Sequence, residues 1–197
     1  MKHQLAKSPK LPGIRLVLLC LTLTACATSP AEDAVFVHEN FDLANYTRVA
    51  VLPLENLTGD RFAAERVREL LSVELAAQGP FDVVEPGEVN RVLRQQGLAD
   101  AVAIGPAETA ALGTALNAQA LFVGTVMDFE ERRTGSVSLP EVALSLRMLD
   151  AETGIQVWAV TGARSSAKWS TRLFGVGEET QTDAVLRVVR KALRTLE

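Results

Sequence analysis

The sequence has few of the side chains that enzymes most often use for covalent or metal chemistry. Its 197 residues include two cysteines, two histidines and one tyrosine, and aromatic residues make up only 5% of the chain. Both cysteines, Cys20 and Cys26, lie within the first 26 residues, and His38 is the only histidine that follows them. The rest of the chain therefore lacks the residues for a disulfide framework, a cysteine nucleophile or a thiolate metal site.

Sequence motifs for phosphate binding and for serine hydrolysis are missing as well. The segment ENLTGDRF at residues 55–62 has one glycine and no lysine, so it does not fit a Walker loop. No serine stands in a G-x-S-x-G context, and adjacent carboxylates such as Glu130 and Glu131 are typical of solvated surfaces. We therefore predict a protein that is not an enzyme and has no catalytic, metal or cofactor site, although a carboxylate pair that meets only in space stays open.

The N-terminus has the layout of a bacterial lipoprotein export signal. Four basic residues precede an apolar segment, LVLLCLTL, at residues 16–23, which is far shorter than the roughly 20 residues of a membrane-spanning helix. It ends in LTAC at residues 23–26, which matches a lipobox and predicts cleavage after residue 25 and lipidation of Cys26. Cys20 follows two bulky leucines and fits the apolar segment better.

The residues around the lipobox also predict the final location. An ordinary cleaved signal is the alternative interpretation, but acylation of Cys26 would supply more lipid than the two signals that stable membrane anchoring requires. Residue 27 is Ala and not Asp, which in lipoprotein sorting indicates the outer membrane. The sequence thus predicts a lipid-anchored protein of the outer membrane that faces the periplasm, with residues 26–45 as the lipidated cysteine and a short tether.

Length and charge limit the partners of the remaining chain. Without residues 1–25 the chain has 172 residues, the size of one domain, which we place at residues 46–197. Residues 27–131 carry 17 acidic and 6 basic side chains, whereas residues 132–197 carry 7 acidic and 10 basic ones. Such an acidic domain is a poor binder of nucleic acid. The uneven charge could instead pair the domain with a copy of itself as a homo-oligomer.

Hydrophobic periodicity predicts an α/β fold, of the α+β type with one mixed sheet of three to five strands and helices packed on it. The order is β-α-β-α-α-β-β-β-α. Strands are predicted at residues 48–54, 81–85, 120–129, 142–149 and 155–164, and helices at 61–78, 86–96, 106–116 and 182–196. Polar residues at 56, 58 and 60 are expected to satisfy backbone groups at the corner between the first strand and helix.

Two segments are candidates for contact with a protein partner. The loop at residues 168–174 combines two aromatics with two cations, and its proposed contact residues are Lys168, Trp169, Arg172, Leu173 and Phe174. The alternative is that its aromatics cover the end of the core. The last helix carries a basic stripe, which is either a solvated face or a site for acidic lipid or protein, and consists of Arg187, Arg190, Lys191 and Arg194. Glu74 interrupts an apolar helix face, as an edge carboxylate or as a partner contact.

Four segments in the same order resemble the CsgG-type family, whose fold is related to those of TolB amino-terminal domains and the activator LpoB. They are VAVLPLENLTGD at 49–60, FDVVEPGEVNRVLRQQGL at 81–98, LGTALNAQALFVGTVMDFE at 112–130 and LRMLDAETGIQVWAV at 146–160. The similarity spans about residues 48–196. Pore-forming hairpins of the CsgG type need upward of roughly 20 residues, and the two candidate insertions, at 130–141 and 165–180, are 12 and 16 residues long.

The resemblance implies an accessory or assembly module of an envelope export or cell-wall machine, which acts through contacts with an envelope protein. One alternative is a ring-forming subunit of a secretion apparatus, and another is an activator of a peptidoglycan synthase. The short tether argues against the second alternative, because LpoB-like proteins reach their synthase on a long one. A carboxylate-dependent cell-wall hydrolase is a third hypothesis, for which no turnover is expected.

Overall fold

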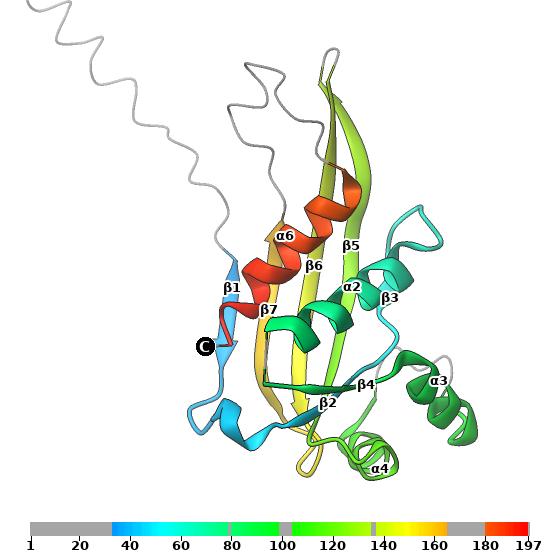
Figure 1. The fold of residues 1–197 in the computed structure, drawn as a ribbon, viewed down its shortest axis with the longest axis vertical. Coiled ribbons are helices and arrows are strands. Elements are labelled where there is room, and N and C mark those ends of the chain that lie inside the picture. Colours follow the sequence, from blue (N-terminus) through cyan, green and yellow to red (C-terminus); the bar gives the residue numbers. More distant parts are fainter. Residues whose placement is uncertain (1–32, 79, 99–103, 135–136, 165–179, 197) are drawn as a thin grey trace, which may run out of the picture. The chain divides into compact units, whose positions relative to one another are not determined.

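The structure is a computed structural model that describes residues 33–78, 80–98, 104–134, 137–164 and 180–196. All described residues belong to one compact unit, Asp33–Glu197 (Figure 1). Its helices are the short 3-10 helix η2 (Leu43–Asn45) and the α-helices α2 (Ala63–Gln78), α3 (Pro86–Gln95), α4 (Pro106–Leu116) and α6 (Gln181–Leu193). Its strands are β1 (Ala34–Val37), β2 (Arg48–Val51), β3 (Glu55–Asn56), β4 (Asp82–Val84), β5 (Ala120–Thr134), β6 (Val137–Asp150) and β7 (Gln156–Arg164).

Within the described residues, seven strands form one mixed sheet in the order β1-β7-β6-β5-β2-β4, with β3 paired to β5. The β2, β3, β4 and β5 pairings are parallel, and β5, β6, β7 and β1 pair antiparallel. The predicted mixed sheet with packed helices is confirmed. The predicted count of three to five strands was wrong, because β1 and β3 are additional strands.

Other differences from the predicted elements lie at the ends of strands and helices; the helix predicted at 182–196, for example, is α6 (Gln181–Leu193). The first strand, predicted at residues 48–54, is shorter in the structure: β2 ends at Val51, and β3 begins only after Pro53, which cannot donate to a ladder. The strand predicted to end at residue 129 continues to Thr134 and pairs with β6 throughout, so most of the candidate insertion at 130–141 is strand. β1 lies inside the stretch that we interpreted as tether.

Helices cover the two faces of the sheet unequally. α2 and α6 lie across one face, where their apolar sides meet β2, β5, β6 and β7 in the larger core cluster (Figure 1). Trp158 and Phe122 are fully buried there, in an edge-to-face contact with ring centroids 6.2 Å apart. α3 and α4 pack on the opposite face, in the smaller core cluster. The strand residues of that cluster come from β2, β4, β5 and the end of β6, and none come from β7. In these two clusters, helices thus pack on β7, the neighbour of β1, from one side only.

The strand pairings define rows of residues that run across the sheet. One row, which we call the upper row, consists of Ala34, Thr161, Ser145, Thr125 and Glu55. A second row, three residues along β5, is the lower row and consists of Val37, Trp158, Met148, Phe122 and Val51. Each row starts at β1 and ends at β3 or β2. The rows therefore show which residues near the two opposite edges of the sheet lie at the same position along the strands.

Candidate functional site

The corner between β3 and α2 is held by its own polar side chains, as predicted. Asn56 Oδ1 accepts from the Thr58 backbone N–H at 3.0 Å, and Asn56 Nδ2 donates to the Asp60 carbonyl at 2.9 Å. Asp60 Oδ1 accepts from the backbone N–H of Phe62 at 2.8 Å. These side chains satisfy backbone groups of the turn, so the segment is a structural corner, and the prediction for residues 56, 58 and 60 is confirmed.

The same corner presents two large apolar side chains to solvent. Leu57 is 62% exposed and Phe62 is 50% exposed, and the guanidinium of Arg61 lies 4.4 Å from the centroid of the Phe62 ring. Large exposed apolar groups that lie close together are more typical of an interaction surface than of a solvated loop. Sequence reasoning missed this feature, because it treated the corner only for its polar residues.

A second apolar surface lies on β1, at the opposite edge of the sheet. Val35, Phe36 and Val37 are consecutive, and each is between 44% and 48% exposed. The His38 N–H donates to the Val157 carbonyl at 2.8 Å, and backbone groups alternate in direction along a strand. The N–H and C=O groups of Val35 and Val37 therefore point away from β7. Natural proteins usually protect such an edge with charge, proline or a bulge, and β1 has none of these.

The basic stripe predicted on the last helix lies on α6, and Arg190 and Lys191 form ion pairs within the chain. Arg190 donates through Nε and Nη2 to the two carboxylate oxygens of Glu74, at 2.9 and 2.7 Å. These hydrogen bonds and the Glu74 charge raise the pKa of Arg190. Lys191 Nζ lies 2.6 Å from Asp33 Oδ2, so it ties α6 to the start of β1. Arg190 and Lys191 therefore each have a carboxylate partner within the domain.

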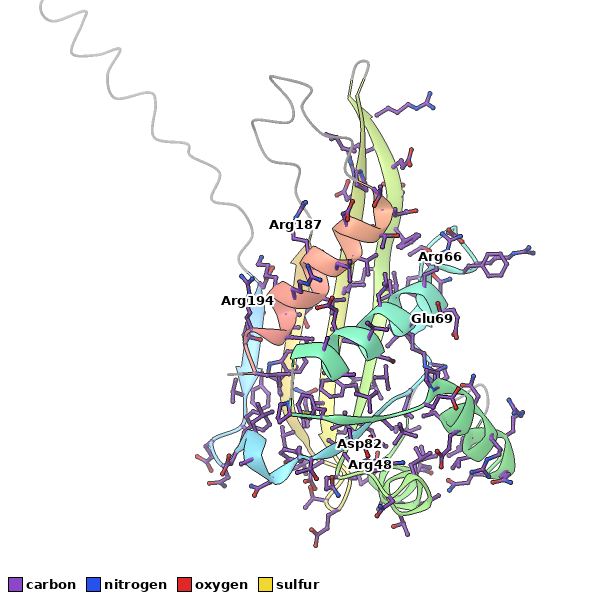
Figure 2. The ribbon with its side chains drawn as sticks, viewed as in Figure 1. Arg48, Arg66, Glu69, Asp82, Arg187 and Arg194 are labelled. Carbon is purple, nitrogen blue, oxygen red and sulfur yellow. The ribbon has the colours of Figure 1, made fainter. Side chains whose placement is uncertain are left out.

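Glu74 is buried, which neither interpretation of the sequence anticipated. Its side chain is only 5% exposed, and its bidentate ion pair joins α2 to α6. The signal was present in the sequence as a carboxylate on an apolar helix face, but its cation lies 116 residues further along the chain. The stripe's other two residues, Arg187 and Arg194, lie on the β1 side of α6 (Figure 2).

The other predicted site residues lie outside the part of the chain that the structure describes. The predicted lipidation site, Cys26, is one of them. The loop that provides Lys168, Trp169, Arg172, Leu173 and Phe174 is the other. Lipidation and partner contact at these positions stay predictions.

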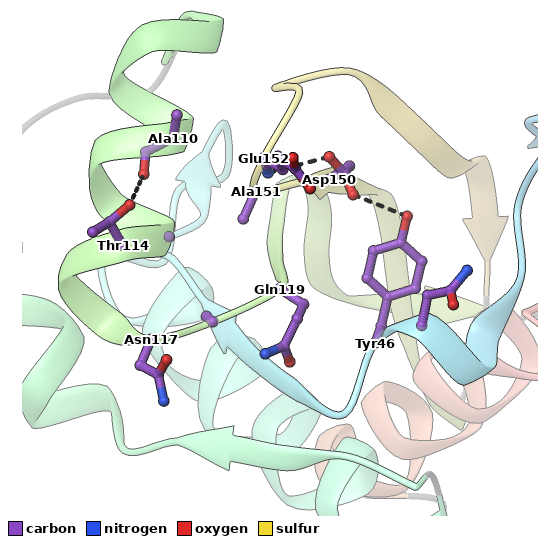
Figure 3. Close-up of a pocket in the computed structure, with 11 residues that line it drawn as sticks. Tyr46, Ala110, Thr114, Asn117, Gln119, Asp150, Ala151 and Glu152 are labelled. Carbon is purple, nitrogen blue, oxygen red and sulfur yellow. Dashed lines mark hydrogen bonds between the residues drawn. The ribbon is translucent and has the colours of Figure 1, made fainter.

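A polar depression of about 800 Å³ lies at the end of the sheet where β2 and β5 begin (Figure 3). The Tyr46 hydroxyl donates to Asp150 Oδ2 at 3.2 Å. Burial of the ring, followed by the charge and hydrogen bond of Asp150, raises the pKa of Tyr46 to about 12. Gln119 Oε1 accepts from the Arg48 backbone N–H at 2.6 Å. These contacts join β2 to its neighbouring segments, so the depression's polar groups hold the fold together.

The Asp150 carboxylate also organises the turn between β6 and β7. Burial alone would raise the pKa of Asp150, but hydrogen bonds from Thr153, Tyr46 and the Glu152 backbone outweigh it, and the pKa lies below its ordinary value. The Thr153 hydroxyl and backbone N–H donate to Asp150 Oδ1 at 2.6 and 2.7 Å. Sequence reasoning had identified the turn from aspartate to glycine but not its link to Tyr46. The Asp150 carboxylate therefore stabilises the turn by accepting these hydrogen bonds.

No three histidine, cysteine, aspartate or glutamate side chains among residues 33–78, 80–98, 104–134, 137–164 and 180–196 are placed to hold a metal ion. None of the helices in these ranges is long and apolar enough to cross a membrane.

Comparisons with known proteins identify the fold. Among the solved structures that the chain resembles are two that it matches along most of their length. One is a dodecamer of a PelC variant from Paraburkholderia phytofirmans, with a TM-score of 0.58 and 20% identity over 84% of this chain and 98% of that one. The other is lipoprotein GNA1162 from Neisseria meningitidis, with a TM-score of 0.54 and 17% identity over 76% and 99%. At these identities the likeness shows a shared fold.

Sequence comparison extends this result to the family. No curated protein sequence matches the chain closely enough to count as a relative. The family model described as "Curli production assembly/transport component CsgG" matches residues 27–196, which include every described element. The chain therefore belongs to the CsgG family, as the four sequence segments predicted.

Proposed function

We propose that this chain is an outer-membrane lipoprotein, anchored through Cys26 and facing the periplasm, that serves an envelope export or cell-wall machine as a non-catalytic accessory module. The lipobox at residues 23–26 supports the anchor. The family description names assembly and transport and no chemical reaction, which supports an accessory role.

The apolar edge formed by β1 is the observation that carries the proposal. Three consecutive apolar side chains, Val35, Phe36 and Val37, are nearly half exposed on a strand whose outer edge pairs with no other described strand. A protein that acts alone gains nothing from such an edge and risks aggregation. An accessory protein gains a surface that another chain can cover. The edge therefore favours a function exerted through protein contacts.

A ring-forming homo-oligomer is the second candidate, and a specific observation favours it. The fold spans 98% of a PelC chain that was crystallised as a dodecamer. The described residues also include an exposed apolar surface on β1 and another at Leu57 and Phe62, on opposite sides of one sheet. A ring needs two different surfaces on each subunit, whereas a dimer needs only one. We infer that the accessory module works as a homo-oligomer.

Metabolic labelling with palmitate tests the anchor. The full chain should incorporate label, and Cys26→Ala should lose it. Cys20→Ala is the matched control, because it removes the other cysteine of the export signal and should leave labelling unchanged. Label that persists in Cys26→Ala would show that the anchor is elsewhere.

Native mass in mild detergent tests the oligomer. The acylated chain should behave as a closed assembly several times the monomer mass, after the detergent contribution is subtracted. The mass should stay constant over a range of protein concentrations, because a closed ring has no free surface for further growth. A monomer at every concentration would remove the homo-oligomer and favour an adaptor that acts only through another envelope protein.

A further inference from the structure

The two exposed apolar surfaces lie on opposite flanks of the sheet and are both bordered by charge. The β1 flank consists of Val35, Phe36 and Val37 with the basic residues Lys191 and Arg194 of α6. Arg194 is exposed, and Lys191 keeps about half of its side chain in solvent although it pairs with Asp33. This flank therefore combines an apolar strand with a basic helix face.

The α2 flank carries exposed carboxylates beside its apolar side chains. It consists of Leu57 and Phe62 at the corner with Glu65, Glu69 and Val73 on α2. Spacing by four residues places Glu65, Glu69 and Val73 on one helix face, where all three are exposed. Arg66 lies on the same side but is paired with Asp60 at 3.1 Å. Glu65 is paired with Arg68 at 3.8 Å, and Arg61 lies over the Phe62 ring. The flank therefore combines apolar side chains with both carboxylates and cations, and Glu69 is the carboxylate on which the contact depends.

The two flanks lie at the same level along the strands. The upper row runs from Ala34 on β1 to Glu55, which precedes Leu57 by two residues. The upper row thus places the start of the β1 edge level with the strand that leads into the exposed corner. Around a ring whose axis runs along the strands, a contact between neighbouring copies requires such matching levels, because rotation about that axis does not shift a subunit along it.

The lower row gives the same result for the charged residues. At one side, Trp158 Nε1 donates to the Thr195 hydroxyl at 3.0 Å, so the end of α6 lies at this level. At the other side, Arg68 Nε donates to the Val51 carbonyl at 3.0 Å. Arg194 and Glu69 are the sequence neighbours of Thr195 and Arg68, and Figure 2 shows them on opposite sides of the domain. Cation and carboxylate are therefore matched in height.

We propose that successive copies of this chain assemble head to tail, with the β1 flank of one copy against the α2 flank of the next. The proposal rests on the self-association proposed above and names its contact surfaces. Val35, Phe36 and Val37 meet the apolar corner of the neighbour, and Arg194 faces the neighbour's Glu69. β1 runs opposite to β3, so the strands that meet at this contact are antiparallel.

The charges disfavour the simplest alternative, a two-fold contact between two β1 edges. Such a contact would bring the two α6 helices together, with Lys191 and Arg194 of each copy near those of the other. Like charges across an interface are unfavourable, and suppress that mode of association. The head-to-tail contact instead places Arg194 of one copy against Glu69 of the next.

A charge-swap experiment tests the contact in the full acylated chain. Glu69→Arg and Arg194→Glu should each raise the protein concentration needed for half assembly about tenfold, because each places like charges across every interface. The double variant should recover assembly, since every interface then regains one cation and one carboxylate. Glu152→Arg is the matched control, because it reverses an exposed carboxylate on the β6–β7 turn away from both flanks, and it should assemble normally.

Cross-linking with a short bismaleimide tests the apolar part of the contact. Val35→Cys combined with Phe62→Cys should give a ladder of covalent multimers, and each single variant should give none. The unaltered chain is the control for Cys26, whose thiol is blocked if it is acylated.

The outcomes separate the two proposals. A monomeric unaltered chain would overturn the self-association, and this contact with it. Assembly that single charge reversals leave unchanged, or that the double variant does not recover, would overturn the head-to-tail contact while the oligomer stands. Covalent dimers from Val35→Cys alone would do the same, because they indicate a two-fold contact between β1 edges.

Discussion

β1 and β7 are neighbouring strands with opposite surroundings. Trp158 and Val160 on β7 are fully buried, and their direct partners on β1, Val37 and Val35, are nearly half exposed. The change occurs within one strand spacing of about 4.8 Å. α6 packs on β7, and its charged side chains, Lys191 and Arg194, lie toward β1. The core of the isolated chain therefore ends at β7, and β1 is apolar beyond what the core requires.

This difference separates two kinds of apolar residue. Those that face α2 and α6 stabilise the fold, and those on β1 and at the corner have little packing to lose within one chain. Substitutions in the first set should lower the free energy of unfolding. Substitutions in the second set should change assembly and leave stability nearly unchanged.

The largest expected effect is at Trp158. Trp158→Ala removes a fully buried ring that contacts Phe122 edge to face and whose Nε1 donates to Thr195. The loss of packing should lower the free energy of unfolding by about 3–5 kcal/mol. Val37→Ala, in the same row of the sheet, is the matched control and should cost about 1 kcal/mol or less. Urea unfolding of both variants gives the comparison, and similar costs would place β1 in the core.

The sequence predicted the buried side of this comparison well. Periodicity identified the apolar face of the last helix, and Val185, Val188, Val189 and Ala192 are all buried. The strand at residues 48–51 and the helix at 106–116 were also found, because each has a continuous pattern and clear end signals such as Pro106.

The exposed side of the comparison could not be predicted from local patterns. β1 has four residues, follows a polar segment and pairs with residues 158–161, more than 120 positions away. The Glu74 and Arg190 pair has the same cause, since no periodicity connects residues 116 positions apart. The mixed-charge residues 130–133 contradict a strand pattern, and only their pairing with β6 makes them part of β5. Contacts between residues far apart in the sequence thus determine β1, the Glu74 and Arg190 pair and the extension of β5.

A smaller effect is expected at Arg68, a buried cation at the edge of the core. Its guanidinium donates to the Val51 carbonyl, to Asn90 Oδ1 at 2.9 Å and to the Pro86 carbonyl at 3.4 Å, so it joins α2 to β2 and α3. Burial lowers the pKa of Arg68, and the charges of Glu65 and Glu69 oppose this. Arg68→Met fills most of the space but leaves these acceptors without a donor, which should cost about 1–3 kcal/mol.

The exposed neighbour Arg66 supplies the control for this prediction. It pairs with Asp60 in a side-chain contact that is largely open to solvent. Arg66→Met should therefore change the free energy of unfolding by no more than about 0.5 kcal/mol. Equal costs for the two substitutions in urea unfolding would show that Arg68 does not tie the helices to the sheet.

The smallest effect concerns Tyr46, which is the only tyrosine in the chain, so the absorbance of tyrosinate reports on it alone. Its pKa of about 12 is raised above the ordinary value of 10.0, first by burial and then by Asp150. A raised pKa means that the folded state holds the proton more tightly. This contribution to stability is full below pH 10 and is lost as the pH rises toward 12.

Asp150→Asn separates the effect of burial on the Tyr46 pKa from the effect of Asp150. The substitution removes the charge, so the Tyr46 pKa should fall toward 10 but stay above it, because burial is the larger cause. Asp150 itself acts in the opposite pH range. Its pKa is lowered in the folded state, so its contribution is present above its ordinary value of 3.8 and is lost as the pH falls below it. Asp150→Asn should therefore weaken the acid sensitivity of unfolding, and an unchanged Tyr46 titration would show that the hydroxyl and the carboxylate are not coupled.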